Sequence, residues 1–310
     1  MRIVQERVSI RVPASALLFN SDFSSVAISL DLWDEISATL TTGASKVVLL
    51  GQGSADLPKD ATHRTIQVML RTLGYLGQPA VGIELVCRNN IPRGIGLGDV
   101  EADVLAGILL VRALLGAPTE FDDLLVRDLA AKFAVQPARF AAAFAGGAQI
   151  AWSDKDGKMK TSALNLAQLH NLTLIIPSEN NGFNRLKRSE NRRSLPAVSP
   201  LVVPDQLQGT VPANAAPLLL YALEHRPSFL RDIAFAARQA AVDGQTRKVA
   251  ETQTQDLAQL AQLLDALQAA GWPAFGVAQS TAIVVFAPLQ GAMQADLAAA
   301  GFSVISVQTA

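Results

Sequence analysis

A glycine-punctuated turn at residues 89–103 constrains the fold of this chain more than any other stretch; it reads Asn-Asn-Ile-Pro-Arg-Gly-Ile-Gly-Leu-Gly-Asp-Val-Glu-Ala-Asp. Before it, residues 81–87 alternate apolar and other side chains, which predicts a half-buried strand. After it, residues 100–115 are rich in Ala, Leu, Val and Ile, and Gly116 is placed to end a helix. The sequence therefore predicts a strand, a glycine-rich turn and a helix in that order.

Three glycines determine the chemistry that this turn can support. Gly94, Gly96 and Gly98 permit positive φ angles and a close approach of the backbone. Main-chain N–H groups can then converge on an anion at the start of the helix. The turn therefore has the form of a phosphate-binding loop.

Three carboxylates follow the glycines, and two interpretations of them stay open. In the first, Asp99 is an N-cap, and Glu101 and Asp103 complement the helix dipole from its first turn. In the second, Asp99 and Glu101 hold Mg²⁺. Without a bridging metal, the same charges would repel a triphosphate.

Length and charge set outer bounds on the function. The chain has 310 residues, with 26 Lys and Arg against 27 Asp and Glu, a formal net charge of -1. This length predicts two domains or one two-lobed domain, and the charge balance indicates no nucleic-acid or anionic-membrane partner. The only cysteine is Cys87, so an internal disulfide is excluded. Because no signal-peptide-like or membrane-spanning segment is visible, we expect a cytoplasmic protein.

Periodicity predicts further elements on the N-terminal side of the turn. Residues 7–12 alternate like a strand, residues 13–22 are expected to form a loop, and residues 23–33 read as a second strand. The apolar spacing within residues 62–76 predicts a helix. His63, at its start, is interpreted as a surface or capping residue without a chemical role.

The turn resembles the second motif of the GHMP small-molecule kinases, Pro-x-x-x-Gly-Leu-Gly-Ser-Ser-Ala-Ala. The residues that match are Pro92, Gly96, Leu97, Gly98 and Ala102. Where the family has two serines for phosphate and magnesium and a further alanine, this chain has an aspartate, a valine and a glutamate. The resemblance implies ATP binding at the turn, and the substitutions imply that this binding is altered.

Residues 10–35 resemble the opening of the homoserine kinase branch of that family, closely at both ends of the segment. In between, an amide that contacts the substrate in the family is replaced by Leu18, and an acidic partner by Ser24. The resemblance implies that Ser15 and Asn20 contact a substrate. Scaffold residues of the opening therefore persist, whereas polar site residues have become apolar or small.

A basic run at residues 178–196 carries one further match. Arg192, Leu195 and Pro196 agree with the end of a family loop whose arginine contacts the substrate. As a functional residue, Arg192 would bind a carboxylate or phosphate through paired N–H groups. As an alternative, the whole run is a solvated loop.

Other family features are lost from this chain. Residues 134–139, which correspond to the segment with the magnesium glutamate, keep only Pro137, which is expected to break a helical pair. A family arginine is replaced by Pro217. The third motif lies in a predicted hairpin at residues 273–286, and its turn at residues 278–282 contains no glycine.

The resemblance implies an α+β, two-domain GHMP-kinase-like fold, with an N-terminal domain at residues 1–160 and a C-terminal domain at residues 161–310. The losses favour a divergent member with impaired or lost phosphotransfer, a pseudoenzyme kept as a metabolite-binding or interaction module that needs no cofactor. The alternative is an active kinase that uses ATP and Mg²⁺ to phosphorylate the hydroxyl of a small metabolite such as homoserine. In that case Gly94, Gly96 to Gly98 and Asp99 hold the nucleotide. A homodimer is left open, because family members often dimerise.

Overall fold

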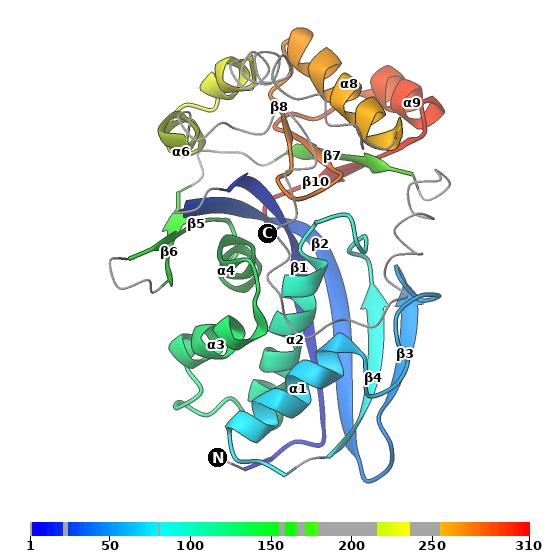
Figure 1. Cartoon of the computed structure of the whole chain (residues 1–310), viewed down its shortest axis with the longest axis vertical. Helices are drawn as coiled ribbons and strands as arrows, with labels where there is room; N and C mark the ends of the chain where they lie inside the picture. Colours follow the sequence, from blue (N-terminus) through cyan, green and yellow to red (C-terminus); the bar gives the residue numbers. More distant parts are fainter. Residues whose placement is uncertain are drawn as a thin grey trace.

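The computed structural model describes residues 2–20, 24–79, 81–154, 159–165, 171–178, 216–235 and 255–310. Figure 1 shows two sheets, each covered by helices. The mixture of helices and antiparallel-rich sheets confirms the expected α+β class. Arg192 and most of the basic run lie outside the described residues, as does the side chain of Pro217.

The larger sheet has six strands, in the order β3-β4-β2-β5-β6, with β1 paired to β2. Its pairs are antiparallel except for β3 and β4, which run parallel. The strands are β1 (Arg7–Asn20), β2 (Ser24–Thr41), β3 (Lys46–Gly51), β4 (Gly82–Asn89), β5 (Ala148–Ser153) and β6 (Met159–Leu164). The strand expected before the glycine turn is confirmed as β4, whose burial alternates as its sequence does.

The loop expected at residues 13–22 is wrong, because β1 continues to Asn20. Its register on β2 shifts between Pro13 and Ala14 and again between Leu17 and Phe19. Such bulges admit a proline and let the strand bend. The apolar run that follows Pro13 is buried almost throughout, so it is stabilised as a buried strand paired with β2 and not as a surface loop.

Helices cover one face of the larger sheet (Figure 1). Two of them, α2 and α4, pack on β1 and β2, and α1 packs on α2. The helices are α1 (Arg64–Tyr75), α2 (Asp99–Leu114), α3 (Asp123–Ala130), the short 3₁₀ helix η1 (Ala131–Phe133) and α4 (Pro137–Ala145). The predicted helix ends are confirmed: Gly116 has a φ of 75° after α2, and Pro137 is the first residue of α4.

The smaller sheet has four strands in the order β10-β7-β9-β8. The predicted hairpin is confirmed as β8 and β9, which pair antiparallel. In Figure 1 α8 and α9 lie on the side of this sheet away from the larger one, whereas α6 contacts β6 of the larger sheet. The elements are β7 (Leu172–Pro177), α6 (Ala216–Glu224), α8 (Gln255–Ala269), β8 (Ala274–Gly276), β9 (Ile283–Val285), α9 (Gly291–Ala299) and β10 (Phe302–Val307).

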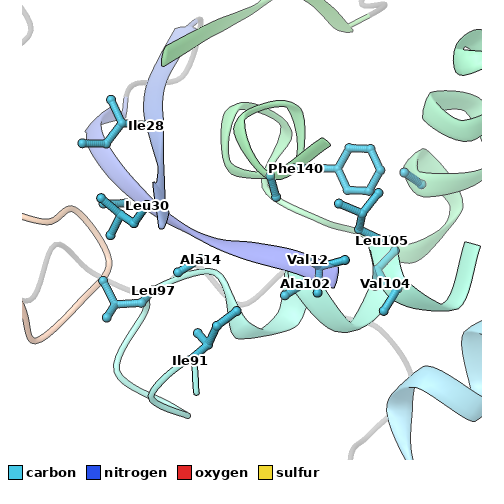
Figure 2. Packing of buried hydrophobic residues seen from close by; sticks show 14 of the residues in the cluster. Val12, Ala14, Ile28, Leu30, Ile91, Leu97, Ala102, Val104, Leu105 and Phe140 are labelled. Atoms are coloured by element: carbon cyan, nitrogen blue, oxygen red, sulfur yellow. The ribbon is translucent and has the colours of Figure 1, made fainter. Parts of the chain in front are cut away.

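The apolar core reaches up to the glycine turn. Figure 2 shows side chains of β1 and β2 packed against the turn, α2 and α4. Leu97, within the turn, is fully buried, and so is Ile91 at its start. Burial of each such side chain contributes about 1.5–3 kcal/mol, so apolar packing helps to hold the turn against the sheet.

Hydrogen bonds join the two sheets at three places. Ala278 N–H donates to the Leu17 carbonyl at 2.7 Å, and Gln308 N–H donates to an Asp31 carboxylate oxygen at 2.7 Å. The Ser29 hydroxyl donates to the carbonyl of Ala310 at 2.6 Å. Because β6 pairs with β5, the larger sheet extends to Leu164, past the expected boundary at 160. The division into two domains stays a prediction.

Among the described helices, none has the length and apolar character needed to span a membrane.

Burial of Cys87 in β4 gives a first prediction. The side chain is 1% exposed, and burial raises the pKa of the thiol to about 12. The reactive species is the thiolate, so we expect Ellman's reagent at about pH 8 to label the native protein at least about 100-fold more slowly than the urea-unfolded chain. Labelling of the native protein at the unfolded rate would contradict the buried position of β4.

His63 gives a second prediction. It is the buried N-cap of α1, and its Nδ1 accepts from Thr65 N–H at 3.3 Å. Burial lowers the pKa of His63 from 6.5, so below that pH the unfolded state binds a proton that the folded state does not. The contribution of neutral His63 to stability is therefore fully present above pH 6.5 and is lost as the pH falls below that value. We expect urea midpoints measured across this range to fall less on acidification for His63→Asn, which keeps the cap, than for the wild type; equal slopes would refute this.

Candidate phosphate-binding turn

The three glycines of the turn between β4 and α2 all adopt positive φ angles, 71° at Gly94, 84° at Gly96 and 77° at Gly98. The turn is also tightly enclosed. A Cβ atom on Gly96 would collide with the Gln279 carbonyl, and one on Gly98 with the Ser15 hydroxyl. Glycine is therefore required at these two positions by space as well as by backbone angle.

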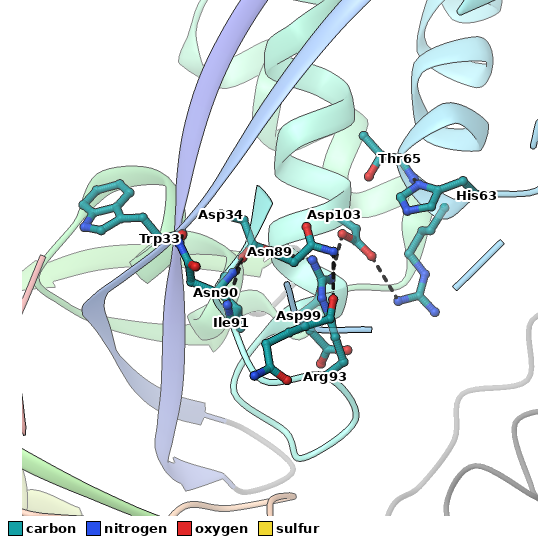
Figure 3. A network of polar contacts seen from close by, with 12 residues as sticks. Trp33, Asp34, His63, Thr65, Asn89, Asn90, Ile91, Arg93, Asp99 and Asp103 are labelled. Atoms are coloured by element: carbon teal, nitrogen blue, oxygen red, sulfur yellow. Dashed lines mark hydrogen bonds and ion pairs between the residues drawn. The ribbon is translucent and has the colours of Figure 1, made fainter. Parts of the chain in front are cut away.

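A buried arginine that the sequence analysis did not single out holds the turn in place (Figure 3). Arg93 forms an ion pair with Asp34 on β2, and its Nη1 lies 2.9 Å from Asp103 Oδ1 on α2. Asp103 also lies 3.8 Å from Nη1 of Arg64 on α1. The Arg93 guanidinium therefore ties the turn to the sheet and to α2, and Arg64 extends the network to α1.

Both partners of the ion pair between Arg93 and Asp34 contact further groups, although Arg93 Nε has no hydrogen-bond partner among the described residues. Asp34 Oδ1 accepts from the N–H groups of Asn90 and Ile91 at 2.7 and 2.9 Å. Burial disfavours the charge of Arg93, but Asp103 and Asp34 outweigh this effect and raise the pKa of the guanidinium. Arg93 therefore remains charged across the accessible pH range.

A signal for this network was present in the sequence. Asp34 lies two residues before Ile36 and four before Ala38, at a position of β2 that faces the core. A carboxylate at such a position needs a cation and hydrogen-bond donors. The partner could not be chosen from the sequence, because Arg93 lies 59 residues away along the chain.

The three carboxylates after the glycines point to different partners. Gly98, and not Asp99, is the N-cap of α2, and Asp99 Oδ2 accepts from Gly94 N–H at 3.2 Å. Glu101 Oε1 accepts from Gln136 N–H at 3.0 Å, at the start of α4. Asp103 belongs to the arginine network. The Asp99 carboxylate therefore lies inside the turn and accepts a hydrogen bond from an N–H group that a bound anion would otherwise use.

This arrangement does not fit a magnesium ion held by Asp99 and Glu101. Residues two apart on a helix do not face each other, and each of these carboxylates already accepts a backbone hydrogen bond. Among the described residues, no group of three or more His, Cys, Asp and Glu side chains converges to hold a metal ion. The metal role of the pair stays a prediction that the geometry does not support.

The loop between β8 and β9 lies directly against the glycine turn. Thr281 N–H donates to the Ile95 carbonyl at 3.0 Å, and the Ser280 hydroxyl donates to the same carbonyl. Gln279 has a φ of 56°, an angle that favours glycine. The turn expected at the family's third motif is therefore next to the second motif. Its Ser280 hydroxyl is bonded to the protein itself, whereas the buried Thr281 hydroxyl has no hydrogen-bond partner among the described residues.

The predicted substrate residues lie apart. Ser15 is fully buried behind the turn, and its N–H donates to the Leu97 carbonyl at 3.1 Å. Asn20 is at the far end of β1, about 16 Å further along an extended strand. Arg192 lies outside the described residues. The substrate roles of these three residues stay predictions.

A second residue that the sequence analysis missed is Arg139, on α4. Its Nη2 donates to the Ala278 carbonyl at 2.7 Å, beneath the loop that covers the turn. The signal was a single cation among alanines and phenylalanines in residues 137–145. Such a residue on a buried helix requires a negative partner.

The network predicts a large cost for removing Arg93. Replacement by Met leaves two buried carboxylates without their cation, so we expect Arg93→Met to lower the free energy of unfolding by about 3–5 kcal/mol. The control is Lys160→Met, which removes a partly exposed ion pair in which Lys160 Nζ lies 3.6 Å from Asp154 Oδ2. This substitution should lower the free energy of unfolding by less than about 1 kcal/mol. Urea unfolding of both variants measures this, and an Arg93 cost equal to that of the control would contradict the inferred anchor.

Comparison with known proteins identifies the family. No family model matches the chain. The homoserine kinase of Mycobacterium tuberculosis is 31% identical over 226 residues, which cover 71% of this chain and 68% of that protein. The homoserine kinase of Streptomyces coelicolor is 29% identical over 224 residues, 72% of this chain and 69% of that protein.

Solved structures agree in fold. Homoserine kinase from Cytophaga hutchinsonii superposes with a TM-score of 0.65 at 18% identity, covering 100% of this chain and 96% of that one. L. major mevalonate kinase in complex with R-mevalonate also superposes with a TM-score of 0.65, at 13% identity, covering 100% and 99% of the two chains. Together with the glycine turn and its neighbouring loop, these likenesses show that the chain belongs to the homoserine kinase family of the GHMP kinases.

Proposed function

We propose that this chain is a divergent member of the homoserine kinase family with impaired or lost ATP-dependent phosphotransfer, retained as a metabolite-binding or interaction module. The observation that carries the proposal is the hydrogen bond from Gly94 N–H to the Asp99 carboxylate. A phosphate-binding turn needs free N–H groups and a positive helix end. Here an internal anion takes one of these N–H groups.

Electrostatic repulsion should further weaken the binding of a phosphate at the turn. Asp99 and Glu101 both lie in the first turn of α2, where they offset the partial positive charge of the helix end. Two like unit charges about 4 Å apart repel by about 4 kcal/mol at an effective dielectric constant of about 20. A phosphate brought to the turn would meet this repulsion from Asp99, so ATP affinity should be weak.

The loop between β8 and β9 supports the same proposal. Phosphoryl transfer relies on groups that are free to stabilise the charge of the transferred phosphoryl group. In this chain the Ser280 hydroxyl donates to the Ile95 carbonyl, and Gln279 stands over Gly96. The loop is fastened to the turn through the Ile95 carbonyl, which leaves the Ser280 hydroxyl engaged and not free for a phosphate.

The proposal predicts that Asp99→Ser gains nucleotide affinity. Serine removes the charge and releases Gly94 N–H, so we expect titration calorimetry to show at least about tenfold tighter ATP binding than in the wild type. Glu120→Ser, an exposed acidic position away from the turn, is the control and should leave the affinity unchanged. Equal or weaker binding by Asp99→Ser would argue against the internal anion.

Activity is tested directly by incubating the wild-type chain with ATP, Mg²⁺ and homoserine and measuring ADP release, with the M. tuberculosis relative as the positive control for the assay. We expect no release above background. If the wild type releases ADP and Asp99→Ala abolishes that release, the proposal is overturned. The chain would then be an active kinase that uses Asp99 to hold its metal ion.

A further inference from the structure

The loop between β8 and β9, residues 277–282, is buried although it is a connecting segment. Val277 N–H donates to the Ala282 carbonyl at 2.9 Å and closes the loop, and both Ser280 and Thr281 within it are fully buried. Connecting segments usually lie on the surface, where water satisfies their polar groups. This loop lies against the glycine turn instead, so its polar groups depend on partners within the protein.

Two features of the loop are unfavourable as long as it stays in this position. Gln279 has a φ of 56°, in the left-handed region, which strains a residue that carries a Cβ atom. The buried hydroxyl of Thr281 has no hydrogen-bond partner in the part of the chain that the structure describes. Such a hydroxyl has lost its hydration without compensation. The closed position therefore carries backbone strain at Gln279 and an unsatisfied group at Thr281.

One end of the loop is firmly anchored. The N–H of Ala278 donates to the Leu17 carbonyl on β1 at 2.7 Å. The carbonyl of Ala278 accepts from Arg139 Nη2 on α4, also at 2.7 Å. Both backbone groups of this residue are therefore tied to the larger sheet and its helices.

The other end is held by a single atom of the glycine turn. Thr281 N–H donates to the Ile95 carbonyl at 3.0 Å, and the Ser280 hydroxyl donates to the same carbonyl. This end also closes over the turn, because the Gln279 carbonyl lies where a Cβ atom on Gly96 would be. Release of one acceptor would therefore uncover the turn at Gly96.

We infer that residues 279–281 form a latch, which pivots at Ala278, opens by releasing the Ile95 carbonyl and so controls access to the glycine turn. Opening breaks two hydrogen bonds, but it lets Gln279 leave the left-handed region and lets water reach the Thr281 hydroxyl. Because these gains offset the loss, the latch opens locally, without unfolding of the sheet. The inference goes beyond the proposed function, since it concerns access to the turn whether or not phosphotransfer is retained.

Amide hydrogen exchange of the native full chain, measured residue by residue by NMR, tests the latch. Thr281 N–H exchanges when the latch opens, whereas Ala278 N–H exchanges only when the anchor breaks. After correction for intrinsic rates, we expect Thr281 N–H in the wild type to exchange at least about 100-fold faster than Ala278 N–H. Equal rates would overturn the inference, because the loop would then open only together with its anchor.

Two substitutions should tighten the latch without removing a tether. Gln279→Gly removes the left-handed strain, and Thr281→Val removes the unpaired hydroxyl but keeps a branched side chain of similar size. We expect each to slow exchange of the N–H at position 281 at least about threefold relative to that of Ala278. Ser280→Ala removes one of the two bonds to the Ile95 carbonyl and should speed the same exchange at least about threefold.

A matched control separates the latch from a general effect on stability. Ala134 has a φ of 51° at the end of η1, far from the loop in sequence, so Ala134→Gly relieves the same kind of strain outside the latch. It should leave the ratio of the two exchange rates unchanged. If Gln279→Gly and Thr281→Val slowed both N–H groups by one common factor, they would act on the whole fold and the latch would be refuted. The assay for ADP release does not enter these outcomes, so failure of the latch and failure of the proposed function are distinguishable.

Discussion

The candidate site depends on one buried guanidinium. Arg93 neutralises Asp34 on the sheet and Asp103 on α2, and both carboxylates are nearly inaccessible to water. Opening the turn would expose or unpair charges that are already desolvated, which costs several kcal/mol. The backbone of the turn is therefore held in shape without any ligand, and the positions of the carboxylate of Asp99 and of the neighbouring loop follow from it.

This anchor explains how a fold can persist when its chemistry changes. The family's shape is maintained by apolar packing around Leu97 and Ile91 and by the arginine network, and neither needs a phosphate. The candidate phosphate site consists of N–H groups and a helix end, and a single carboxylate already accepts a hydrogen bond from one of these N–H groups. We propose that the aspartate at position 99, where the family has a serine, weakens phosphate binding while the turn keeps its shape, and this is the physical basis of the proposed loss of phosphotransfer.

Local patterns predicted the elements around the site well. Alternation identified β4, apolar richness and Gly116 identified α2, and the position of Pro137 identified the start of α4. The loop expected after Pro13 was wrong because a proline usually ends a strand, whereas pairing with β2 on a bulged register kept this one extended. The tendency of a proline to end a strand acts locally, and pairing with β2 outweighed it.

By itself, the sequence indicated the order strand–turn–helix and the positive φ angles that Gly96 and Gly98 permit, because these depend on periodicity and backbone angles within a few residues. The α+β class was implied by the family resemblance. Only the tertiary structure decided which charges meet. Asp99 and Glu101, which the sequence analysis considered as magnesium ligands, are directed by helical rotation to Gly94 and to the start of α4, and Asp103 is directed to Arg93. Electrostatic pairing depends on distance in space, which the chain sets only when β2, α2 and α4 pack together.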